Sequence, residues 1–525
     1  MPDVVPVVPA PLVLEPVDAP PYVVSAATTV VVATTGAAVD DPAAHPATPA
    51  AVLVADLLGR AAGHAVRLAF EDPGVPGAVH VRLLPDAPAA STGPGAPGAG
   101  AVGDGRDADA LPPGDEAYRV VVAADGVRLD ARTPEGLVHG VVTLRQLLRE
   151  LPDGGVEVPA VRVVDAPRYA WRGLSLDVAR HFVSVPDLKV VIGLLGHYKL
   201  NVLHLHLTDD QAWRLDLPSR PELVRRSSAH SVGGDPGGHY SAADWDEILT
   251  FAQARGVRVV PEIDVPGHVN AAQHAYGELN PDGRPTDEYL GIEVGFSRLH
   301  DDLPATHAFL ADVFGDLARM TPGAYVHVGG DEVLTMAPEE YARLVRAAAD
   351  AVAAHGRTVV GWQEVAHVDG LPPGTVVQLW DDRVDPAPFV AAAERGARIL
   401  LSPGSRVYLD MKYDADFPLG LEWAGHVELR DAYAWEPEEF LPGLPEGAVI
   451  GVEAALWTET LRTLDDLTTM LLPRLAAVAE VAWSAPERRD LADLTRRLTA
   501  HGAYWDRLGL AWYRSPQGVW DAPVS

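Results

Sequence analysis

The sequence predicts an α/β protein in which a (β/α)₈ barrel follows a small α/β accessory domain. From Arg172 onward, short strand-like runs alternate with amphipathic helical stretches, as a parallel βα fold requires. Eight such runs in about 320 residues match the size of a barrel with insertions. The residues before them carry separate hairpin and helix signals. We therefore place the accessory domain at residues 1–165, and the barrel with a C-terminal helical segment at residues 166–525.

The accessory domain is predicted from one hairpin and one capped helix. Two strand-like runs, Tyr118–Ala123 and Val127–Ala131, flank Ala124-Asp125-Gly126, which is a good tight-turn sequence. Thr133-Pro134-Glu135 then supplies an N-cap residue, a proline in the first turn and an acidic residue, which together start a helix. Pro88–Gly114 is rich in alanine, glycine and proline, so we expect a mobile loop there. Nothing in this domain predicts catalytic chemistry.

The barrel strands are predicted at short runs that are rich in apolar residues. They cover residues 173–180, 201–209, 257–264, 324–330, 358–363, 375–380, 398–402 and 449–457. Helices are expected between most of them, for example at residues 186–199, 241–255, 304–320 and 338–355. Ser241 suits the N-cap of the second of these helices, and Pro338 suits the first turn of the fourth. Gly233–Gly238 marks an inserted loop.

Composition and charge limit the classes of partner. The chain has 525 residues, of which 48% are hydrophobic and 22% charged, as in an ordinary globular protein. Its formal net charge of −32 disfavours nucleic acid, anionic lipid and acidic polymers, so we expect a neutral ligand. The absence of cysteine excludes disulfides, thiolate metal sites and a cysteine nucleophile. We see no export signal or membrane-spanning run and expect a cytoplasmic protein, although a trimmed secreted protein would look the same.

Acidic and aromatic side chains gather where the predicted strands end. In such barrels the C-terminal ends of the strands and the following loops form the active site. Carboxylates that converge with several tryptophans are typical of a sugar pocket, because indole faces stack on pyranose rings and acids bind hydroxyl groups. The residues at these strand ends are Asp177, Arg180, Asp209, Asp210, Glu262, Asp264, His268, Asp331, Glu332, Trp362, Trp380, Trp457 and Glu459.

Four segments around these strand ends resemble the signature motifs of glycoside hydrolase family 20, the β-N-acetylhexosaminidases. They are Asp177–Phe182, Leu203–Arg214, Pro261–His268 and His327–Val333, and their spacing also fits. The resemblance runs from about residue 115 to about residue 485, and Asp125–Leu148 is similar to the family's small N-terminal domain. Ala212 stands where a glycine is usual, and the long Ala/Pro/Gly loop is peculiar to this chain. Neither departure affects the acidic residues of the motifs.

The resemblance implies a retaining exo-β-N-acetylhexosaminidase that releases terminal β-linked N-acetylglucosamine or N-acetylgalactosamine. Glu332 would be the general acid and then the general base. Asp331 would orient the substrate's own 2-acetamido group, whose oxygen attacks the anomeric carbon; such substrate-assisted families depart from the scheme with two catalytic carboxylates. Neighbouring residues of a strand point to opposite sides. Both acids therefore reach one substrate only if the strand breaks, which Gly329-Gly330 permits.

The same resemblance implies roles for other residues. Tyr408 would donate its hydroxyl to the acetamido carbonyl, while Asp209 and His268 would form a chain that tunes the pKa of Glu332. The implied substrate-binding residues are Trp362, Trp380 and Trp457 as pocket walls, Arg180, Asp410 and Glu459 at the outer hydroxyls, and Trp423 on the aglycone side. The implied partner is a neutral amino-sugar oligosaccharide or glycoconjugate, as in chitin or glycan degradation. No cofactor, metal, nucleic acid or membrane is expected, and no sequence feature indicates the oligomeric state.

Some of these residues also have structural interpretations. Asp331 and Glu332 alone would suit a loop ion pair, and Arg180 would suit a partner for Asp177 or Asp209. The three histidines His204, His206 and His327 alternate with leucine and valine, so we expect them to point into the barrel, where they fill its layers or support the catalytic groups from behind more often than they act as catalytic groups. Asp264 is equally consistent with a role in the turn at Pro266-Gly267.

Two other functions are open on the sequence. His204-Leu205-His206 at a strand end is similar to the metal pair of barrel amidohydrolases. That family often adds a bridging modified lysine, and this chain has no lysine between Lys199 and Lys412. A sugar-binding protein without catalysis is the second alternative, and the intact Asp331-Glu332 pair argues against it.

Overall fold

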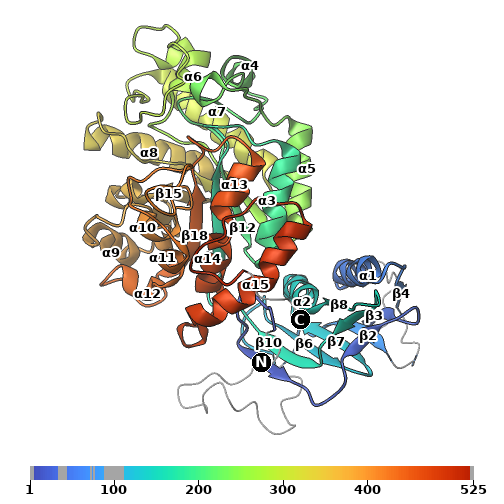
Figure 1. Cartoon of the computed structure of the whole chain (residues 1–525). Helices are drawn as coiled ribbons and strands as arrows, with labels where there is room; N and C mark the ends of the chain where they lie inside the picture. Colours follow the sequence, from blue (N-terminus) through green and yellow to red (C-terminus); the bar gives the residue numbers. More distant parts are fainter. Residues whose placement is uncertain (1–4, 34–43, 71–73, 75–76, 88–110, 521–525) are drawn as a thin grey trace. The chain divides into compact units, whose positions relative to one another are not determined.

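The computed structural model describes residues 5–33, 44–70, 74, 77–87 and 111–520 (Figure 1). Internal contacts divide the chain into two compact units. The first comprises Met1–Arg168, Trp483–Gly502 and Gly518–Ser525, and the second comprises Tyr169–Ala482 and Ala503–Gln517. The second unit holds a closed barrel and the first an open sheet with helices, so the predicted fold class is confirmed.

The C-terminal segment is divided differently from the sequence-based expectation, which assigned residues 166–525 to the barrel. Trp483–Gly502, which includes most of helix α15 (Leu491–Arg507), groups with the first unit. There the indole N–H of Trp483 donates to Asp165 Oδ1 over 3.0 Å. The amphipathic pattern of α15 predicts an apolar face, but it does not indicate which of the two cores that face packs against.

The first unit is built on a seven-stranded mixed sheet in the order β1-β10-β6-β7-β5-β3-β4. Its strands are β1 (Val13–Pro16), β3 (Thr29–Ala33), β4 (Arg67–Ala69), β5 (Ala78–Leu83), β6 (Tyr118–Ala123), β7 (Gly126–Ala131) and β10 (Val161–Asp165). A three-stranded sheet contains β2 (Tyr22–Val24), β9 (Val156–Val158) and β8 (Arg149–Glu150). The predicted hairpin is present as the antiparallel pair β6 and β7. Most of the loop expected at residues 88–114 lies outside the described residues, which resume at residue 111.

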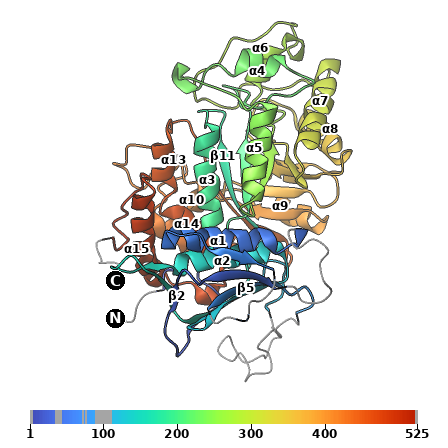
Figure 2. The ribbon, with the colours of Figure 1, turned by 90° about the vertical axis from the view of Figure 1, so that its right-hand side faces the viewer.

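Helices α1 (Thr48–Ala62) and α2 (Pro134–Leu147) cover one face of the seven-stranded sheet (Figure 2). Helix α2 begins as predicted: the Thr133 side chain accepts a hydrogen bond from the N–H of Gly136, and Pro134 stands in the first turn. Leucines and valines of both helices are buried against the sheet in one apolar core. This unit therefore folds around its own core.

The second unit is a closed barrel of parallel strands in sequence order, β11 to β18. The strands are β11 (Trp171–Asp177), β12 (Val202–His206), β13 (Arg258–Glu262), β14 (Tyr325–His327), β15 (Thr358–Trp362), β16 (Val376–Leu379), β17 (Arg398–Leu401) and β18 (Val449–Leu456). Strands β11 and β18 pair and close the barrel. Seven of the predicted runs contain their strand, and the run at residues 173–180 overlaps β11, so the eight-stranded prediction is confirmed.

Helices surround the barrel strands, as the region around β12, β15 and β18 shows (Figure 1). The longer ones are α3 (Val185–His197), α5 (Ala242–Gln253), α7 (Pro304–Met320), α8 (Pro338–Ala353), α9 (Ala387–Glu394), α13 (Leu464–Leu471) and α14 (Arg474–Trp483). Shorter ones are α4 (Glu222–Ser227), α6 (Asn270–Ala275), α10 (Gly404–Val407), α11 (Leu429–Tyr433) and α12 (Pro437–Phe440), with 3₁₀ turns at Val232–Gly234, Gly277–Leu279 and Gln363–His367. A further 3₁₀ turn, Pro486–Arg488, belongs to the first unit. Ser241 forms the predicted cap of α5, as part of a capping box with Asp244. Within the described residues, no helix has the length and apolar character that a membrane span needs.

The barrel interior has an apolar end and a polar end. Near the starts of the strands, valines, a leucine and a tryptophan form a buried cluster: Trp171, Val202, Val260, Val360, Val376 and Leu400. Nearer the strand ends, register places Asp177 beside His206, His206 beside Glu262, and Glu262 beside His327. Residues in register on adjacent parallel strands share one face of the sheet. The polar end therefore lies directly below the mouth at which the strands terminate.

Candidate active site

The predicted break in the backbone follows strand β14. Gly329 and Gly330 have φ angles of 70° and 111°, and Glu332 has a φ of 51°. A Cβ atom at Gly329 would lie only 1.7 Å from Asp264 Oδ1, so this position requires glycine. The same oxygen accepts a hydrogen bond from the N–H of Gly330 over 3.0 Å. Asp264 thus holds the break in place, in addition to lying near the Pro266-Gly267 turn.

Asp331 and Glu332 both project toward His268. The Nε2 atom of His268 lies 3.8 Å from Asp331 Oδ2 and 3.6 Å from Glu332 Oε2. The two acidic side chains are 13% and 30% exposed, so both remain accessible to a ligand. Burial and the charge of Asp331 raise the pKa of Glu332 to about 7, against the opposing charges of His268 and Arg180. Glu332 can therefore bind or release a proton near neutral pH.

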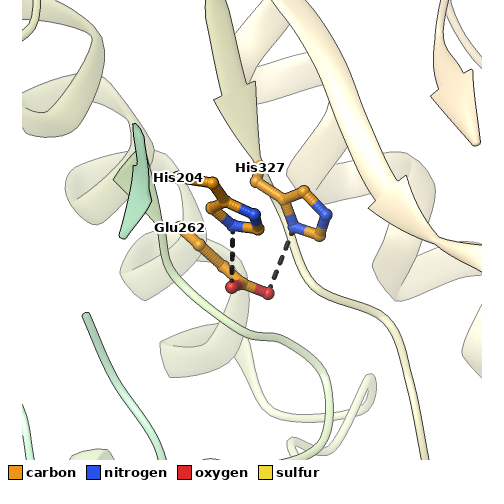
Figure 3. A group of neighbouring side chains, drawn as sticks. All are labelled: His204, Glu262 and His327. Carbon is orange, nitrogen blue, oxygen red and sulfur yellow. Dashed lines mark ion pairs between the residues drawn. The ribbon is translucent and has the colours of Figure 1, made fainter. Parts of the chain in front are cut away.

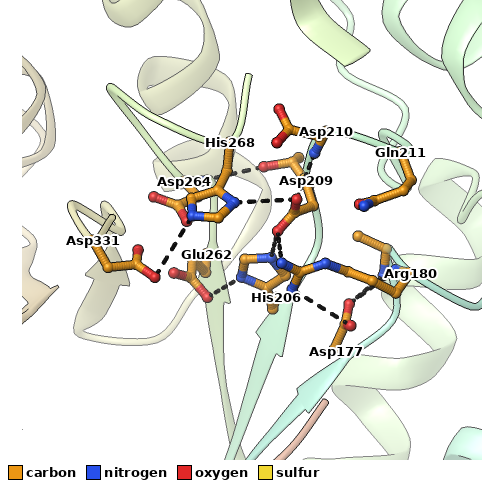
Figure 4. A network of polar contacts seen from close by, with 12 residues as sticks. Asp177, Arg180, His206, Asp209, Asp210, Gln211, Glu262, Asp264, His268 and Asp331 are labelled. Atoms are coloured by element: carbon orange, nitrogen blue, oxygen red, sulfur yellow. Dashed lines mark hydrogen bonds and ion pairs between the residues drawn. The ribbon is translucent and has the colours of Figure 1, made fainter. Parts of the chain in front are cut away.

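A chain of ion pairs continues from His268 to Asp209 and Arg180 (Figure 4). His268 Nδ1 lies 3.2 Å from Asp209 Oδ1, and Arg180 Nη2 lies 2.8 Å from Asp209 Oδ2. Burial raises the pKa of Asp209, but the charges of Arg180 and His268 outweigh it and hold this pKa well below its usual range. Arg180 also lies 3.6 Å from Asp177, so it pairs with both carboxylates that the sequence suggested.

Five aromatic side chains form a continuous wall beside the acidic pair. Trp362 at the end of β15 lies 5.9 Å from Trp457 after β18, measured between ring centroids. Tyr408 lies 6.3 Å from Trp457 and 5.6 Å from Trp423, and Trp423 lies 5.8 Å from Trp380. The structure thus brings together all four tryptophans and the tyrosine that the sequence proposed. Such a wall suits the C–H faces of a sugar ring.

Tyr408 reaches this wall through a contact that the sequence pattern did not predict. It follows helix α10, and it forms a β-bridge with Ala455 of strand β18. The N–H of Leu409 donates to the carbonyl of Ala455 over 2.7 Å. Burial and the charge of Asp410 hold the pKa of Tyr408 well above its usual range, so its hydroxyl stays protonated.

Several buried polar atoms of the mouth make no hydrogen bond within the described part of the chain. Among the described residues, no group hydrogen-bonds to Arg180 Nε or Nη1, to either carboxylate oxygen of Asp410, or to Glu459 Oε2. Burial raises the pKa of Glu459 although Arg180 opposes this, and burial together with the charge of Glu459 raises that of Asp410. Unpaired buried polar atoms are rare in stable proteins, and they indicate a site that binds a polar ligand.

The histidines of the barrel interior are placed as ion-pair partners (Figure 3). His204 Nδ1 lies 2.9 Å from Glu453, and its Nε2 lies 2.9 Å from Glu262. His206 lies 2.7 Å from Glu262 and 2.8 Å from Asp209. Burial lowers the pKa of His204 and of His206, but the neighbouring carboxylates raise them to about 9 and about 10.

The same geometry bears on the amidohydrolase alternative. His204, Glu262 and His327 each bring one donor atom within 4.8 Å of the others, as metal ligands would. An imidazole must lose its proton to bind a metal ion. With a pKa of about 9, His204 keeps that proton near neutral pH. Glu262 already accepts a hydrogen bond from the Trp362 indole over 2.8 Å and one from His206. These residues fit a network of ion pairs better than a metal centre.

Glu364 is a residue of the mouth that the sequence reasoning missed. It lies in the 3₁₀ turn after Trp362, and its Oε2 accepts a hydrogen bond from the indole N–H of Trp380 over 3.3 Å. Burial and the charge of Asp331 raise its pKa to about 8. Its position directly after a strand end was the available signal. Glu453 was also missed; as a lone carboxylate inside the apolar run of β18, it could have been recognised as a buried charge.

Comparison with known proteins extends these observations. Residues 169–486 match the model of the glycosyl hydrolase family 20 catalytic domain, and residues 4–166 match the model of family 20 domain 2. A β-N-acetylhexosaminidase from Cellulomonas fimi is 59% identical over 525 residues, which cover 100% of this chain and 99% of that protein.

Solved structures of other proteins are similar to this chain along nearly its whole length. The family 20 β-N-acetylhexosaminidase from Streptomyces coelicolor is 41% identical, with 99% of both chains covered and a TM-score of 0.87. A mutant β-hexosaminidase from Streptomyces plicatus, in complex with product (GlcNAc), is 40% identical, with 98% of both chains covered and a TM-score of 0.86. Because family models match both parts of its length and these relatives match nearly all of it, the chain belongs to glycosyl hydrolase family 20.

Proposed function

We propose that the chain is an exo-β-N-acetylhexosaminidase that retains anomeric configuration and uses the substrate's 2-acetamido group as the nucleophile. The main support for this proposal is the position of Asp331 and Glu332 at a backbone break beside an aromatic wall. The two side chains differ in exposure, at 13% and 30%. The product (GlcNAc) bound to the Streptomyces plicatus relative supports an amino sugar as the ligand. The net charge of −32 supports a neutral one.

Glu332 acts first as the general acid. It gives its proton to the glycosidic oxygen while the bond from that oxygen to the anomeric carbon breaks, and it then takes a proton from the attacking water. A group that performs both steps needs a pKa near the working pH. The pKa of about 7 for Glu332 meets this requirement.

Asp331 orients and stabilises the internal nucleophile. The acetamido carbonyl oxygen attacks the anomeric carbon, forms a five-membered oxazolinium ring and leaves positive charge on that ring. The carboxylate of Asp331 accepts the acetamido N–H and offsets the charge. Its Oδ1 is buried and, within the described part of the chain, accepts no hydrogen bond, so an acceptor is ready for this N–H. Because no bond to Asp331 forms, the reaction has no glycosyl-enzyme intermediate.

The aromatic wall binds the acetamido group and the sugar ring. Trp362, Trp380 and Trp457 enclose the apolar methyl and ring faces, while Tyr408 donates its hydroxyl to the acetamido carbonyl. The protonated state of Tyr408 supports this donor role. Trp423, which is 40% exposed, contacts the aglycone side of the cleaved bond.

Arg180, Asp410 and Glu459 bind the hydroxyl groups of the terminal sugar. Their buried atoms without hydrogen bonds supply both donors and acceptors for those hydroxyls. These residues close the pocket around the non-reducing end, so only terminal residues are released. Asp209 and His268 complete the site, because His268 is held as a cation that faces Glu332 and lowers its pKa.

The mechanism is tested with matched substrates and a mimic of the intermediate. We expect hydrolysis of an aryl N-acetyl-β-glucosaminide, negligible hydrolysis of the aryl β-glucoside, and a β-configured first product. A thiazoline that copies the oxazolinium ring should bind at least about 10²-fold more tightly than the substrate, and Asp331→Asn should weaken it. Rapid glucoside cleavage or a covalent adduct on Asp331 would contradict the acetamido mechanism, and an inverted product would contradict retention.

A further inference from the structure

A line of alternating acidic and basic side chains runs from the catalytic centre into the barrel interior (Figure 4). His268 pairs with Asp209 over 3.2 Å, Asp209 with His206 over 2.8 Å, and His206 with Glu262 over 2.7 Å. All four side chains are at most 2% exposed. The proposed function uses His268 and Asp209, whereas His206 and Glu262 have no role in it.

Glu262 joins the polar line to the pocket wall. Its Oε1 accepts the indole N–H of Trp362 over 2.8 Å, and its Oε2 accepts from His206 Nδ1. His204 and His327 flank the same carboxylate at 2.9 Å and 3.1 Å. Burial raises the pKa of Glu262, but the three histidines outweigh it and hold this pKa well below its usual range. A single ionised carboxylate thus fixes both Trp362 and His206.

His206 is the link between Glu262 and Asp209. Its pKa of about 10 means that both ring nitrogens carry protons near neutral pH, one directed at each carboxylate. Its ring also packs against Trp457 in a T-shaped arrangement, with the ring centroids 5.0 Å apart. The ring therefore has little freedom to rotate away from either partner.

Asp209 needs this support because it serves two functional side chains. Its Oδ2 accepts from Arg180 at 2.8 Å and from His206, and its Oδ1 faces His268. Arg180 is proposed to bind the sugar, and His268 to act on Glu332. Any shift of Asp209 would move both of them. His206 is the donor that reaches Asp209 from the barrel interior.

We propose that Glu262 and His206 are positioning residues for glycoside hydrolysis. Glu262 holds His206 as a double hydrogen-bond donor, and His206 fixes Asp209 so that Arg180 and His268 face the substrate. This inference rests on the function proposed above. Replacing a buried ion pair by apolar residues is often neutral or stabilising. The charges at this end therefore serve the geometry of the site.

Two substitutions of His206 test its hydrogen bond to Glu262 and its hydrogen bond to Asp209 separately. In place of histidine, an asparagine amide lies near the position of Nδ1, and a glutamine amide near that of Nε2. His206→Asn thus keeps a donor toward Glu262 and loses the one to Asp209, whereas His206→Gln does the reverse. The control is His204→Gln, which is equally buried on the same strand and contacts Glu262 and Glu453 instead of Asp209.

We expect His206→Asn to lower kcat by roughly 10–100-fold, by analogy with the loss seen when residues that hold metal ligands in place are changed. His206→Gln should lose less, and His204→Gln least, with thermal unfolding measured for all three. Equal losses in the three variants would overturn the proposal, since they would indicate a general structural role. An unmodified protein without activity on N-acetyl-β-glucosaminides would instead contradict the proposed function.

The pH profile supplies a readout that packing alone would not move. The charged groups around His206 are Glu262, Asp209, Arg180, Asp177 and Asp264. Removing the His206 cation favours the neutral form of Glu332 and raises its pKa. The basic limb of kcat/KM should therefore move up by about 0.5 pH unit or more in both His206 variants. In His204→Gln it should stay near its original position; a limb that stays unmoved in the His206 variants would overturn the proposal.

A measurement on the unmodified enzyme covers the case in which His206→Asn fails to fold. In ¹⁵N-histidine spectra, the His206 signals are identified by their loss in His206→Gln. Both ring nitrogens should be protonated at about pH 8, where a free histidine is neutral. A neutral His206 ring at that pH would overturn its role as a double donor.

Discussion

Strand β13 passes from Val260 to Glu262, and over that short distance the barrel interior changes from apolar to charged. On the apolar side, Val260 packs with Val202 and Leu400 in a cluster that excludes water. On the charged side, the carboxylate of Glu262 contacts three histidines and the indole of Trp362. Both ends are buried, and strands β12 and β13 contribute side chains to each.

The two ends of the barrel interior contribute different properties to the protein. Apolar burial is the main favourable term in folding, so the apolar end stabilises the barrel. Removing ions from water is unfavourable by several kcal/mol per ion before pairing, so the charged end adds little stability. It instead gives the residues above it fixed positions and shifted pKa values. Changes at the charged end should therefore affect turnover, and changes at the apolar end should affect unfolding.

The largest effect is expected from Glu332→Gln, directly above the charged end. Loss of a general acid typically lowers turnover by about 10²–10⁴-fold. The loss should be smaller for an activated aryl leaving group, which needs little protonation, than for an alkyl one. Steady-state rates on both substrates check this, with thermal unfolding as the control for folding. Equal losses on the two leaving groups would remove Glu332 from the acid role.

The pH dependence of the unmodified enzyme gives the next effect. Burial and the charge of Asp331 raise the pKa of Glu332 to about 7, so its protonated form is present below that pH and is lost above it. Activity that needs this proton should fall about tenfold per pH unit on the alkaline side. The measurement is kcat/KM against pH for an alkyl N-acetyl-β-glucosaminide. A basic limb that persists unchanged in Glu332→Gln would belong to another group.

The apolar end should show the opposite behaviour. Leu400→Ala removes a fully buried side chain from the apolar cluster and should lower the free energy of unfolding by about 2–5 kcal/mol. Because the change lies away from the mouth, kcat/KM should stay within about twofold. Denaturant unfolding and steady-state kinetics on the same preparation measure both quantities. A large fall in kcat/KM without loss of stability would contradict the proposed division of the interior.

The smallest effect is expected from removal of metal ions. His204 and His327 both contact the carboxylate of Glu262, at 2.9 Å and 3.1 Å, and His204 keeps its proton near neutral pH, so excess chelator should leave kcat/KM unchanged. The control is readdition of zinc or magnesium after dialysis, which should also change nothing. Loss of activity in chelator, with recovery when the metal ion is added back, would show that the charged end is a metal centre.

Much of the mouth could be predicted because its residues follow recognisable strands. Arg180, Asp209, His268, Trp362 and Trp457 each stand at or just after a strand end, and the barrel topology brings such ends together. The glycines before Asp331 also revealed the need for a break. These features depend on local sequence and on one global rule, so a single sequence contains them.

The buried network could not be predicted in the same way. The contacts in this network depend on the register between strands that are far apart in the chain. Examples are the contact of Glu453 with His204 and those of Glu262 with His206 and Trp362. The pattern within one strand shows which residues share a face, but it does not show which residue of a distant strand lies opposite each of them. The placement of Tyr408 against β18 and the grouping of Trp483–Gly502 with the first unit likewise arise from long-range contacts.

The left-handed backbone of Glu332, with its φ of 51°, sets a limit on engineering this enzyme. That conformation disfavours a residue with a Cβ atom by on the order of 1 kcal/mol, whereas glycine adopts it freely. A library screened only for survival of heating would therefore enrich substitutions that relax this position and discard its carboxyl group. Directed evolution toward a heat-resistant form must demand turnover in every round, because at Glu332 resistance and catalysis select different amino acids.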